Sequence, residues 1–319
     1  MDRTDLRIFS RLVGDALLSD EQLGREVGLT GKAVRLRRQR MEAEGVLTEY
    51  GIHPAAEVLG RHSMTWRYVG KDWSRLPISR LLEVEDLAYV MSFRPGLHLV
   101  VRFTKETDPI PDPRLARIFG QPLEGLPDER PSVSTIPPDQ LSRVDWKVLE
   151  AVVRVPRSPS TIQARQANIS RRTLRAHRSR LEAGHALDCV MILNVEREAG
   201  LATYGIWLKV DDSFDKRSVE LPRLWDRPHW TQHPRGVYLL GSADNYFAAR
   251  EMELRLRSLP GVVGADPLIP AGGFFARDRL LDWIRVERER RFPTPRPAGP
   301  KPPARPRFRP DEATPFDVH

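Results

Sequence analysis

Two stretches of this chain carry side chains suited to contact DNA bases and phosphates, spaced as on one face of a helix. Each begins with a hydroxyl residue that can cap a helix, Thr30 in the first and Ser170 in the second. In the major groove, Lys and Arg donate to guanine and Gln bonds adenine in two places. No acidic residue interrupts either stretch before Glu42 and Glu182, whereas an ordinary solvated face mixes both signs. The candidate DNA-binding residues are Thr30, Lys32, Arg35, Gln39 and Arg40 in the first stretch and Ser170, Arg171, Arg172, Arg175, Ser179 and Arg180 in the second.

A helical projection separates these candidates from the residues that would face a core. Val34 marks the core side of the first stretch, so the candidate base-contacting residues point away from the core and the flanking arginines point toward phosphates. Arg38 and Arg178 fall near the core side, where an unpaired guanidinium would be costly to bury. We therefore expect Arg38 to pair with Asp5, and Arg178 with Asp145.

The two stretches belong to a longer internal repeat. A constant offset of 140 residues separates them, and the same offset relates Asp5 to Asp145 and Gly96 to Gly236 without a gap. One register kept over roughly a hundred residues is the signature of repeated structural units. The sequence therefore predicts a tandem duplication, in which each element of the first half recurs in the second.

Composition limits the class of protein. The 319 residues allow two to four domains, and a formal net charge of +8 attracts polyanions such as nucleic acid. The single cysteine, Cys189, excludes an intrachain disulfide framework and a multi-cysteine zinc site. The charged N-terminal stretch lacks the apolar core of a signal peptide, and no run of about 18 apolar residues occurs. These features predict a soluble cytoplasmic protein.

The elements that would position the candidate residues are three helices at the start of each repeat. Apolar spacing predicts a helix from Asp5, and Ser19 would cap a short second helix that ends at Gly28. The cationic stretch after Thr30 is the third helix. This order is the helix-turn-helix pattern, and we call each such unit a head. "VLTEYGI" after the first head and "ALDCVMI" after the second are predicted to form a short strand or wing.

Strand-like segments follow each head. In the first repeat they are "SMTWRYVG", "LAYVMSF", "LHLVVRF" and a final strand "SVSTI", with helices at 74–85 and 112–120. In the second repeat they are "TYGIWLKV", "HWTQH", "VYLLGSA" and "GADPLIP", with helices at 215–225 and 246–261. Each repeat is thus predicted to end in a βαββαβ domain.

The succession "DLRIFSRL", "EQLGREVGLT", "RRQRMEAEGVL" and "IHPAAEVLG", followed by a βαββαβ domain, resembles the Lrp/AsnC family of bacterial and archaeal transcriptional regulators. The resemblance covers roughly residues 1–270, in duplicated form. Its most specific part is "EGVL" with the Tyr, Pro and "LG" that follow it. The resemblance implies an α+β fold of two repeats, each a (winged) helix-turn-helix head followed by a ferredoxin-like βαββαβ domain.

We expect six segments on this basis. They are a first head at 1–60, a first βαββαβ ligand and dimerisation domain at 61–138, a second head at 139–200, a second βαββαβ domain at 201–272, a C-terminal helix at 273–292 and a disordered basic Pro-rich tail at 293–319. The tail would be a solvated linker or an arm that contacts DNA.

In the family, βαββαβ domains pair to form dimers, and small effectors, often amino acids, bind at the interfaces. The resemblance implies double-stranded DNA as the partner, an intrachain pseudo-dimer of the two halves, and room for further homo-oligomers. Family members with an amino-acid site tend to carry Gly and Asp at the hairpin of the second and third strands. Gly96 and Gly236 match that glycine, while His98 and Tyr238 stand near where the acid should be. These four residues are the effector candidates, and turn glycines with packing side chains are the alternative.

The sequence offers no catalytic motif that would favour an enzyme. It contains no phosphate-binding Gly-rich loop and no Ser nucleophile elbow, so we expect no cofactor, metal or catalytic residue. The alternative is a tetrapyrrole decarboxylase of the siroheme type, since some of these enzymes resemble Lrp/AsnC regulators in both domains. His98, Arg94 and Arg102 could serve such a cleft. The cationic third helices favour the regulator, because a decarboxylase has no need of them.

Overall fold

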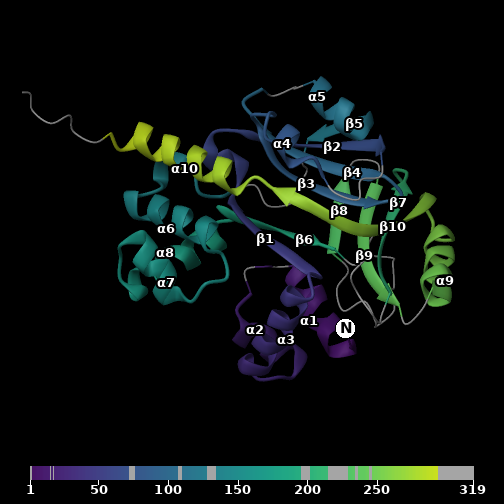
Figure 1. Cartoon of the computed structure of the whole chain (residues 1–319), viewed down its shortest axis with the longest axis horizontal. Coiled ribbons are helices and arrows are strands. Elements are labelled where there is room, and N and C mark those ends of the chain that lie inside the picture. The colour runs from purple at the N-terminus through teal and green to yellow at the C-terminus, as the bar shows by residue number, and fades with distance from the viewer. Residues whose placement is uncertain are drawn as a thin grey trace, which may run out of the picture.

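The computed structural model describes residues 2–14, 16, 18–71, 76–106, 110–127, 134–194, 202–214, 229–233, 236–243 and 246–293 (Figure 1). The predicted helix at 215–225 and the predicted tail after Pro293 lie outside the described residues. No helix in the described part of the chain is long and apolar enough to span a lipid bilayer.

The first head comprises α1 (Arg3–Gly14), α2 (Asp20–Val27) and α3 (Gly31–Ala43). Local signals set these bounds: the Ser19 hydroxyl accepts from the backbone of α2, Gly28 ends α2 in the left-handed conformation with φ 75°, and the Thr30 hydroxyl caps α3. The first head has its own hydrophobic core, which includes the buried residues Ile8, Phe9, Leu12, Leu23, Val34 and Met41.

The second head comprises α6 (Arg143–Arg154), α7 (Ser160–Ala167) and α8 (Arg171–Ala183). Each of these helices begins and ends 140 residues after its counterpart in the first head. Asn168 takes the left-handed conformation with φ 51° in place of glycine. Gln163, where the first head has a core leucine, is buried and donates to the carbonyls of Val155 and Pro156 at 2.9 Å. The buried amide of Gln163 therefore hydrogen-bonds to backbone carbonyls at the end of α6, so it is not left without a partner in the core.

The strand after each head pairs with its counterpart after the other head. β1 (Leu47–Pro54) and β6 (Leu187–Leu193) form an antiparallel two-stranded ribbon in which Tyr50 lies opposite Met191. The expected wing is thus a strand that joins the two halves. Met191 packs in the core of the first head, so the ribbon connects the heads through side chains as well as through backbone hydrogen bonds.

Two four-stranded units follow, with the strand order of a ferredoxin-like fold. The first contains η1 (Ala56–Leu59), β2 (His62–Gly70), α4 (Ile78–Leu81), β3 (Leu87–Arg94), β4 (Leu97–Thr104), α5 (Pro113–Phe119) and β5 (Gly120–Pro127), and η2 (Pro138–Gln140) leads to the second head. The second contains β7 (Ala202–Val210), β8 (His229–His233), β9 (Gly236–Ala243), α9 (Tyr246–Arg257) and β10 (Val262–Phe275). Strand order is β5-β2-β4-β3 in the first unit and β10-β7-β9-β8 in the second.

The predicted final strand of the first unit was placed too late in the chain. β5 begins at Gly120, directly after α5, and residues 134–136 are not a strand. Gly120 permits the reversal because its φ is 110° and a Cβ there would lie 2.5 Å from the carbonyl oxygen of Val69. β5 lies at the edge of the sheet, where its two prolines are tolerated, although they favour a loop in the sequence.

β10 extends across both sheets. Its first part, Val262–Leu268, pairs with β7, and its second part, Ile269–Phe275, pairs with β3, so eight strands are continuous. The C-terminal helix expected at 273–292 therefore begins only at Arg277, after the strand ends, and is α10 (Arg277–Arg291).

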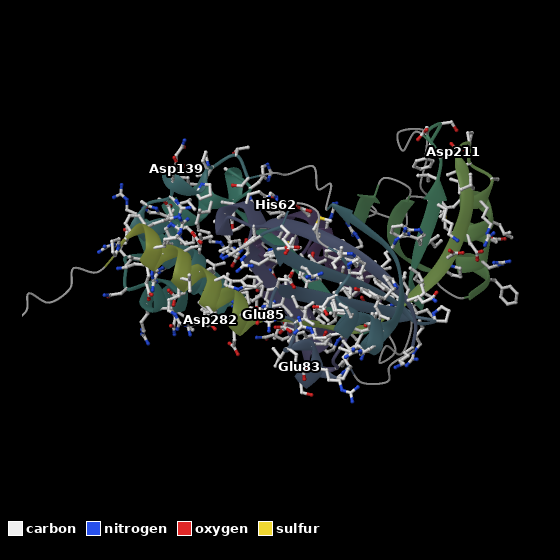
Figure 2. The ribbon with its side chains drawn as sticks, turned by 90° about the horizontal axis from the view of Figure 1, so that it is seen from above. His62, Glu83, Glu85, Asp139, Asp211 and Asp282 are labelled. Carbon is white, nitrogen blue, oxygen red and sulfur yellow. The ribbon has the colours of Figure 1, made fainter. Side chains whose placement is uncertain are left out.

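α10 packs against both the second head and the first βαββαβ domain. Leu280 and Ile284 of α10 share a core with Trp146 and Leu149 of α6. Figure 1 shows α10 above α6, and Figure 2 shows Asp282 of α10 near Glu85, at the opposite end of the molecule from Asp211.

Candidate nucleic-acid interface

The outward face of α3 is exposed as the helical projection predicts. Lys32, Arg35, Leu36 and Gln39 are exposed, while Val34 is fully buried on the opposite side. The capping oxygen of Thr30 accepts from the amide of Ala33 at 3.2 Å, which fixes the start of the helix. α3 therefore presents two cations, an amide and an apolar side chain to solvent, a combination that suits a major groove.

The outward face of α8 is more cationic. Arg171, Arg172 and Arg175 are exposed together with Ser179. Ser170 caps the helix by accepting from the amide of Thr173 at 3.0 Å. No acidic residue occurs from the start of α7 to the end of this face, whereas α2 of the first head contains Asp20, Glu21 and Glu26.

The buried aspartate of the first head pairs with residues other than the one expected. Asp5 is fully buried, and its carboxylate accepts from Arg37 at 2.8 Å and also from Arg40. The predicted pairing of Asp5 with Arg38 is wrong, because the side of α3 that meets α1 carries residues 37 and 40. Arg40 is half exposed but is tied to Asp5, so it holds α3 against α1 as well as facing solvent.

The second head repeats this arrangement with one change. Asp145 is fully buried and accepts from His177 at 2.8 Å and from Arg180 at 2.6 Å. The predicted pairing of Asp145 with Arg178 is also wrong, since Arg178 donates to Glu182 at 2.7 Å and to Gln163 at 3.3 Å. The sequence reasoning missed Arg37 and His177, although the 140-residue offset relates them and could have shown that both face the same partner.

Arg38 occupies a different polar network. It donates to Asp20 at 3.0 and 3.2 Å and pairs with Glu42, which also accepts from the Tyr50 hydroxyl at 2.7 Å. Burial alone would lower the pKa of Arg38, but the hydrogen bonds and carboxylates raise it above its ordinary value. Burial raises the pKa of Tyr50, and Glu42 raises it further, so the phenol stays protonated and donates. The guanidinium of Arg38 is therefore paired as expected, but with a carboxylate of α2 instead of one of α1.

Asp145 makes the stability of the second head dependent on pH. Burial would raise its pKa, but hydrogen bonds from His177, Ser142 and Arg180 outweigh burial and hold the pKa below 3.8. A carboxylate with a lowered pKa stabilises the folded state above its unfolded pKa, and this contribution is lost as the pH falls through the folded pKa. Asp145→Asn should therefore lower the free energy of unfolding by roughly 2–4 kcal/mol at neutral pH. The deficit should shrink as the pH falls from about 5 toward 2.

Urea unfolding of the wild type and Asp145→Asn over this pH range measures that deficit. Asp139→Asn is the matched control, because Asp139 is an exposed aspartate just before α6 (Figure 2). A deficit of the same size at pH 7 and at pH 2, or an equal deficit in the control, would contradict the role given to Asp145.

The effector candidates lie at two hairpins. Gly96 adopts φ 73° in the turn between β3 and β4. His98 is buried, with Nδ1 2.9 Å from the Ser92 hydroxyl and Nε2 2.7 Å from the carbonyl oxygen of Lys71. Gly236 begins β9, and the backbone of Tyr238 pairs with β7 and β8. Both ring nitrogens of His98 thus already have partners inside the domain.

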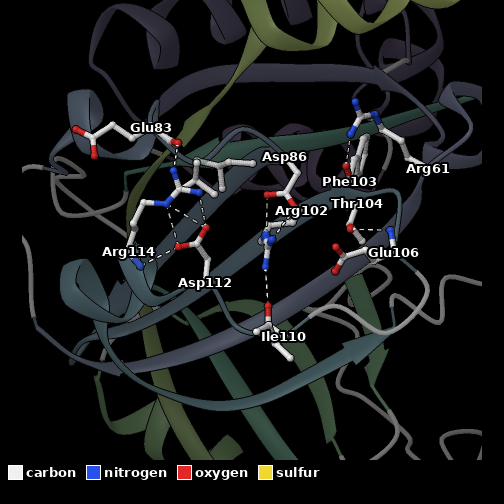
Figure 3. A network of polar contacts seen from close by, with 12 residues as sticks. Arg61, Glu83, Asp86, Arg102, Phe103, Thr104, Glu106, Ile110, Asp112 and Arg114 are labelled. Atoms are coloured by element: carbon white, nitrogen blue, oxygen red, sulfur yellow. Dashed lines mark hydrogen bonds and ion pairs between the residues drawn. The ribbon is translucent and has the colours of Figure 1, made fainter.

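The structure also gives the positions of the two arginines that were considered for a tetrapyrrole cleft, Arg102 and Arg94. Arg102 donates to both carboxylate oxygens of Asp86 at 2.7 and 2.6 Å (Figure 3). Its guanidinium also lies 4.7 Å from the ring centroid of Trp66. Arg114 makes a similar pair with Asp112, whose pKa is lowered mainly by that hydrogen bond. Arg94 ends β3. Arg102 and His98 are therefore part of the core of the first βαββαβ domain.

Comparisons with known proteins agree on the first head. A family model described as the AsnC-type helix-turn-helix domain matches residues 1–42. The uncharacterized HTH-type transcriptional regulator YezC of Bacillus subtilis (strain 168) is 37% identical over 62 residues, which are 19% of this chain and 45% of YezC. The chain thus matches less than half the length of that relative.

Two solved structures are also similar to this chain. The siroheme decarboxylase NirDL, in complex with an iron-uroporphyrin III analogue, is similar over 90% of this chain and 98% of its own, with 11% identity and a TM-score of 0.42. AsnC of E. coli is similar over 43% of this chain and 97% of its own, with 19% identity and a TM-score of 0.25. Residues 1–42 of this chain, which form its first head, therefore match the AsnC-type helix-turn-helix domain.

Proposed function

We propose that this chain is a cytoplasmic, sequence-specific DNA-binding transcriptional regulator in which both heads contact double-stranded DNA. The observation that carries the proposal is the pair of exposed faces on α3 and α8, each following a capped turn and free of acidic residues up to Glu42 and Glu182. Such faces combine phosphate attraction with base-reaching side chains. The chain would act by binding and not by catalysis.

Each head divides its contacts between bases and phosphates. Lys32 and Gln39 of α3 would contact base edges, as would Arg172 and Ser179 of α8. The capped N-termini of both helices and the arginines Arg35, Arg171 and Arg175 would contact phosphates. Arg40 and Arg180 would contribute less, because each is already paired with a buried aspartate.

The two halves would act together as a built-in pseudo-dimer. The β1–β6 ribbon joins the strands that follow the two heads, and β10 joins the two sheets. In Figure 1 the first head lies below the ribbon and the second head lies to its left. Because the recognition residues of the two heads differ, the operator would consist of two unlike half-sites. An amino-acid effector and further homo-oligomers stay predictions, since His98 is already bonded within its domain.

Genome-wide mapping of bound DNA, followed by mobility shifts with the enriched fragments, tests this function. The variant Lys32→Ala/Arg35→Ala/Arg172→Ala/Arg175→Ala should lose the shift, because these four exposed cations lie on the two outward faces. Arg285→Ala is the control, since Arg285 is an exposed cation of α10 paired with Asp282. Failure of the wild type to enrich any fragment, together with saturable binding of iron-uroporphyrin III, would favour the decarboxylase instead.

A further inference from the structure

Arg157 lies in the connection between α6 and α7 of the second head, and its side chain contacts the first head. One guanidinium nitrogen, Nη1, donates to the carbonyl oxygens of Ala16 at 3.0 Å and Leu18 at 2.5 Å. The other, Nη2, donates to the carboxylate of Asp20 at 2.8 Å. The guanidinium also lies 5.4 Å from the ring centroid of Tyr50. A single side chain of one head thus has four partners in or next to the other.

The ion pair between Arg157 and Asp20 is largely buried. The side chain of Arg157 is 14% exposed and that of Asp20 is 16% exposed. Asp20 is the first residue of α2, where a carboxylate also interacts favourably with the helix N-terminus. The same carboxylate accepts from Arg38, which connects the contact to α3. Arg157 is therefore linked through one aspartate to the helix that carries the recognition face of the first head.

A second arginine strengthens the junction from the side of the ribbon. Arg277, at the start of α10, donates to the carboxylate of Glu49 at 2.8 Å, to the carbonyl of Tyr50 at 3.2 Å and to the carbonyl of Val153 at 2.8 Å. It thereby joins β1 to the end of α6. The segment around Tyr50 is held between two arginines that come from, or bind to, the second head.

The contact can form on one side of the molecule only. At the positions offset by 140 residues, the sequence has Leu17 in place of Arg157, Ser160 in place of Asp20 and Val190 in place of Tyr50. None of these can supply the guanidinium, the carboxylate or the aromatic ring of the observed contact. A dimer of two identical halves could not hold one side differently from the other, whereas a single chain with two diverged halves can.

We propose that Arg157 is a positioning residue that fixes the two heads in one relative orientation and so sets the separation of the two DNA half-sites. This inference rests on the proposed function. B-DNA turns once in about 10 base pairs, so each added base pair moves a half-site by about 3.4 Å and rotates it by about 35°. Heads held rigidly can accept one separation, whereas heads that pivot on the ribbon can accept several.

The first experiment measures the heads without DNA. Ala43→Cys and Ala183→Cys place spin labels at matched exposed ends of α3 and α8, in a Cys189→Ser background. The distance distribution from pulsed electron resonance should be narrow in the otherwise wild-type chain and at least about twice as wide with Arg157→Ala. Arg154→Ala is the matched control, because Arg154 is a cation of α6 that pairs with Glu150 of the same helix. An equally narrow distribution in Arg157→Ala, or a broad one in the parent, overturns the proposal.

The second experiment measures half-site separation with a randomised duplex library. The wild type and Arg154→Ala should enrich sites of one separation, and Arg157→Ala should enrich sites of several. Asp20→Asn, which removes one partner of Arg157, should shift the result in the same direction, and it keeps the test valid if Arg157→Ala folds poorly. The same single separation for all four proteins overturns the proposal. If the wild type enriches no sequence at all, the proposed function is wrong, and the distance distributions alone decide whether Arg157 holds the heads.

Discussion

Raising the salt concentration from about 50 to about 200 mM should weaken binding of this chain to its best genomic site by at least about a thousandfold, the loss for six to ten phosphate contacts. Each phosphate neutralised by Lys or Arg releases condensed counterions, so the logarithm of affinity falls by about 0.9 per contact per logarithm of salt. The exposed candidate cations of the two recognition helices together could supply contacts in this range, and those of α3 alone could not. They are Lys32, Arg35, Arg40, Arg171, Arg172, Arg175 and Arg180.

Fluorescence anisotropy of a labelled duplex at several salt concentrations measures the slope. Arg175→Ala should reduce its magnitude by about 1, because one phosphate contact is lost. Arg40→Ala should reduce it less, because Arg40 is paired with the buried Asp5. Arg285→Ala, on α10, should leave the slope unchanged. An affinity that barely responds to salt in this range would refute the model in which both heads engage DNA.

Substitution of one base-contacting residue should relax sequence preference in one half of the operator only. Gln39→Ala should cost roughly 1–3 kcal/mol at an adenine of the half-site bound by the first head, if the amide bonds that base in two places. Arg172→Ala should have a comparable effect at a guanine of the other half-site. The outward positions differ between the heads, so the effects should not be shared.

Selection from random DNA with each variant locates the relaxed positions. Gln166→Ala is the control, because Gln166 is an exposed amide on α7, outside the recognition face. A perfectly palindromic selected site, or equal effects of Gln39→Ala and Arg172→Ala on both halves, would exclude the internal pseudo-dimer. A conventional dimer of chains, with one head of each chain on DNA, would then replace it.

Sequence reasoning located the helices of the heads because their signals are local. Capping by Ser19, Thr30 and Ser170 and the left-handed positions Gly28 and Asn168 involve only neighbouring residues, and the apolar spacing of each helix shows its buried side. The same reasoning failed for the partner of Asp5. A helical projection gives the buried side of α3 but not the angle at which α1 crosses it, and that angle selects Arg37 and Arg40 over Arg38.

Features that depend on distant pairing were harder to predict. β5 was not predicted because it contains two prolines, which favour a loop in the sequence. An edge strand tolerates them, whereas a central strand does not. The start of α10 was placed too early, because β10 continues past the second sheet to pair with β3. Arg157 carried no signal in the sequence, since its partners are two backbone carbonyls, an aspartate and an aromatic ring brought together from more than a hundred residues away.

The β1–β6 ribbon belongs to a single polypeptide, so its formation is a first-order event whose equilibrium does not depend on protein concentration. A regulator assembled from separate chains dissociates on dilution, and its active form rises with the square of chain number when copies are scarce. Occupancy of an operator by this chain would instead rise in simple proportion to the number of copies. The partner strand is always present at high effective concentration, so a half of this protein would not exchange with halves of related regulators in the same cell. The amount of active regulator would therefore depend only on the expression of this chain.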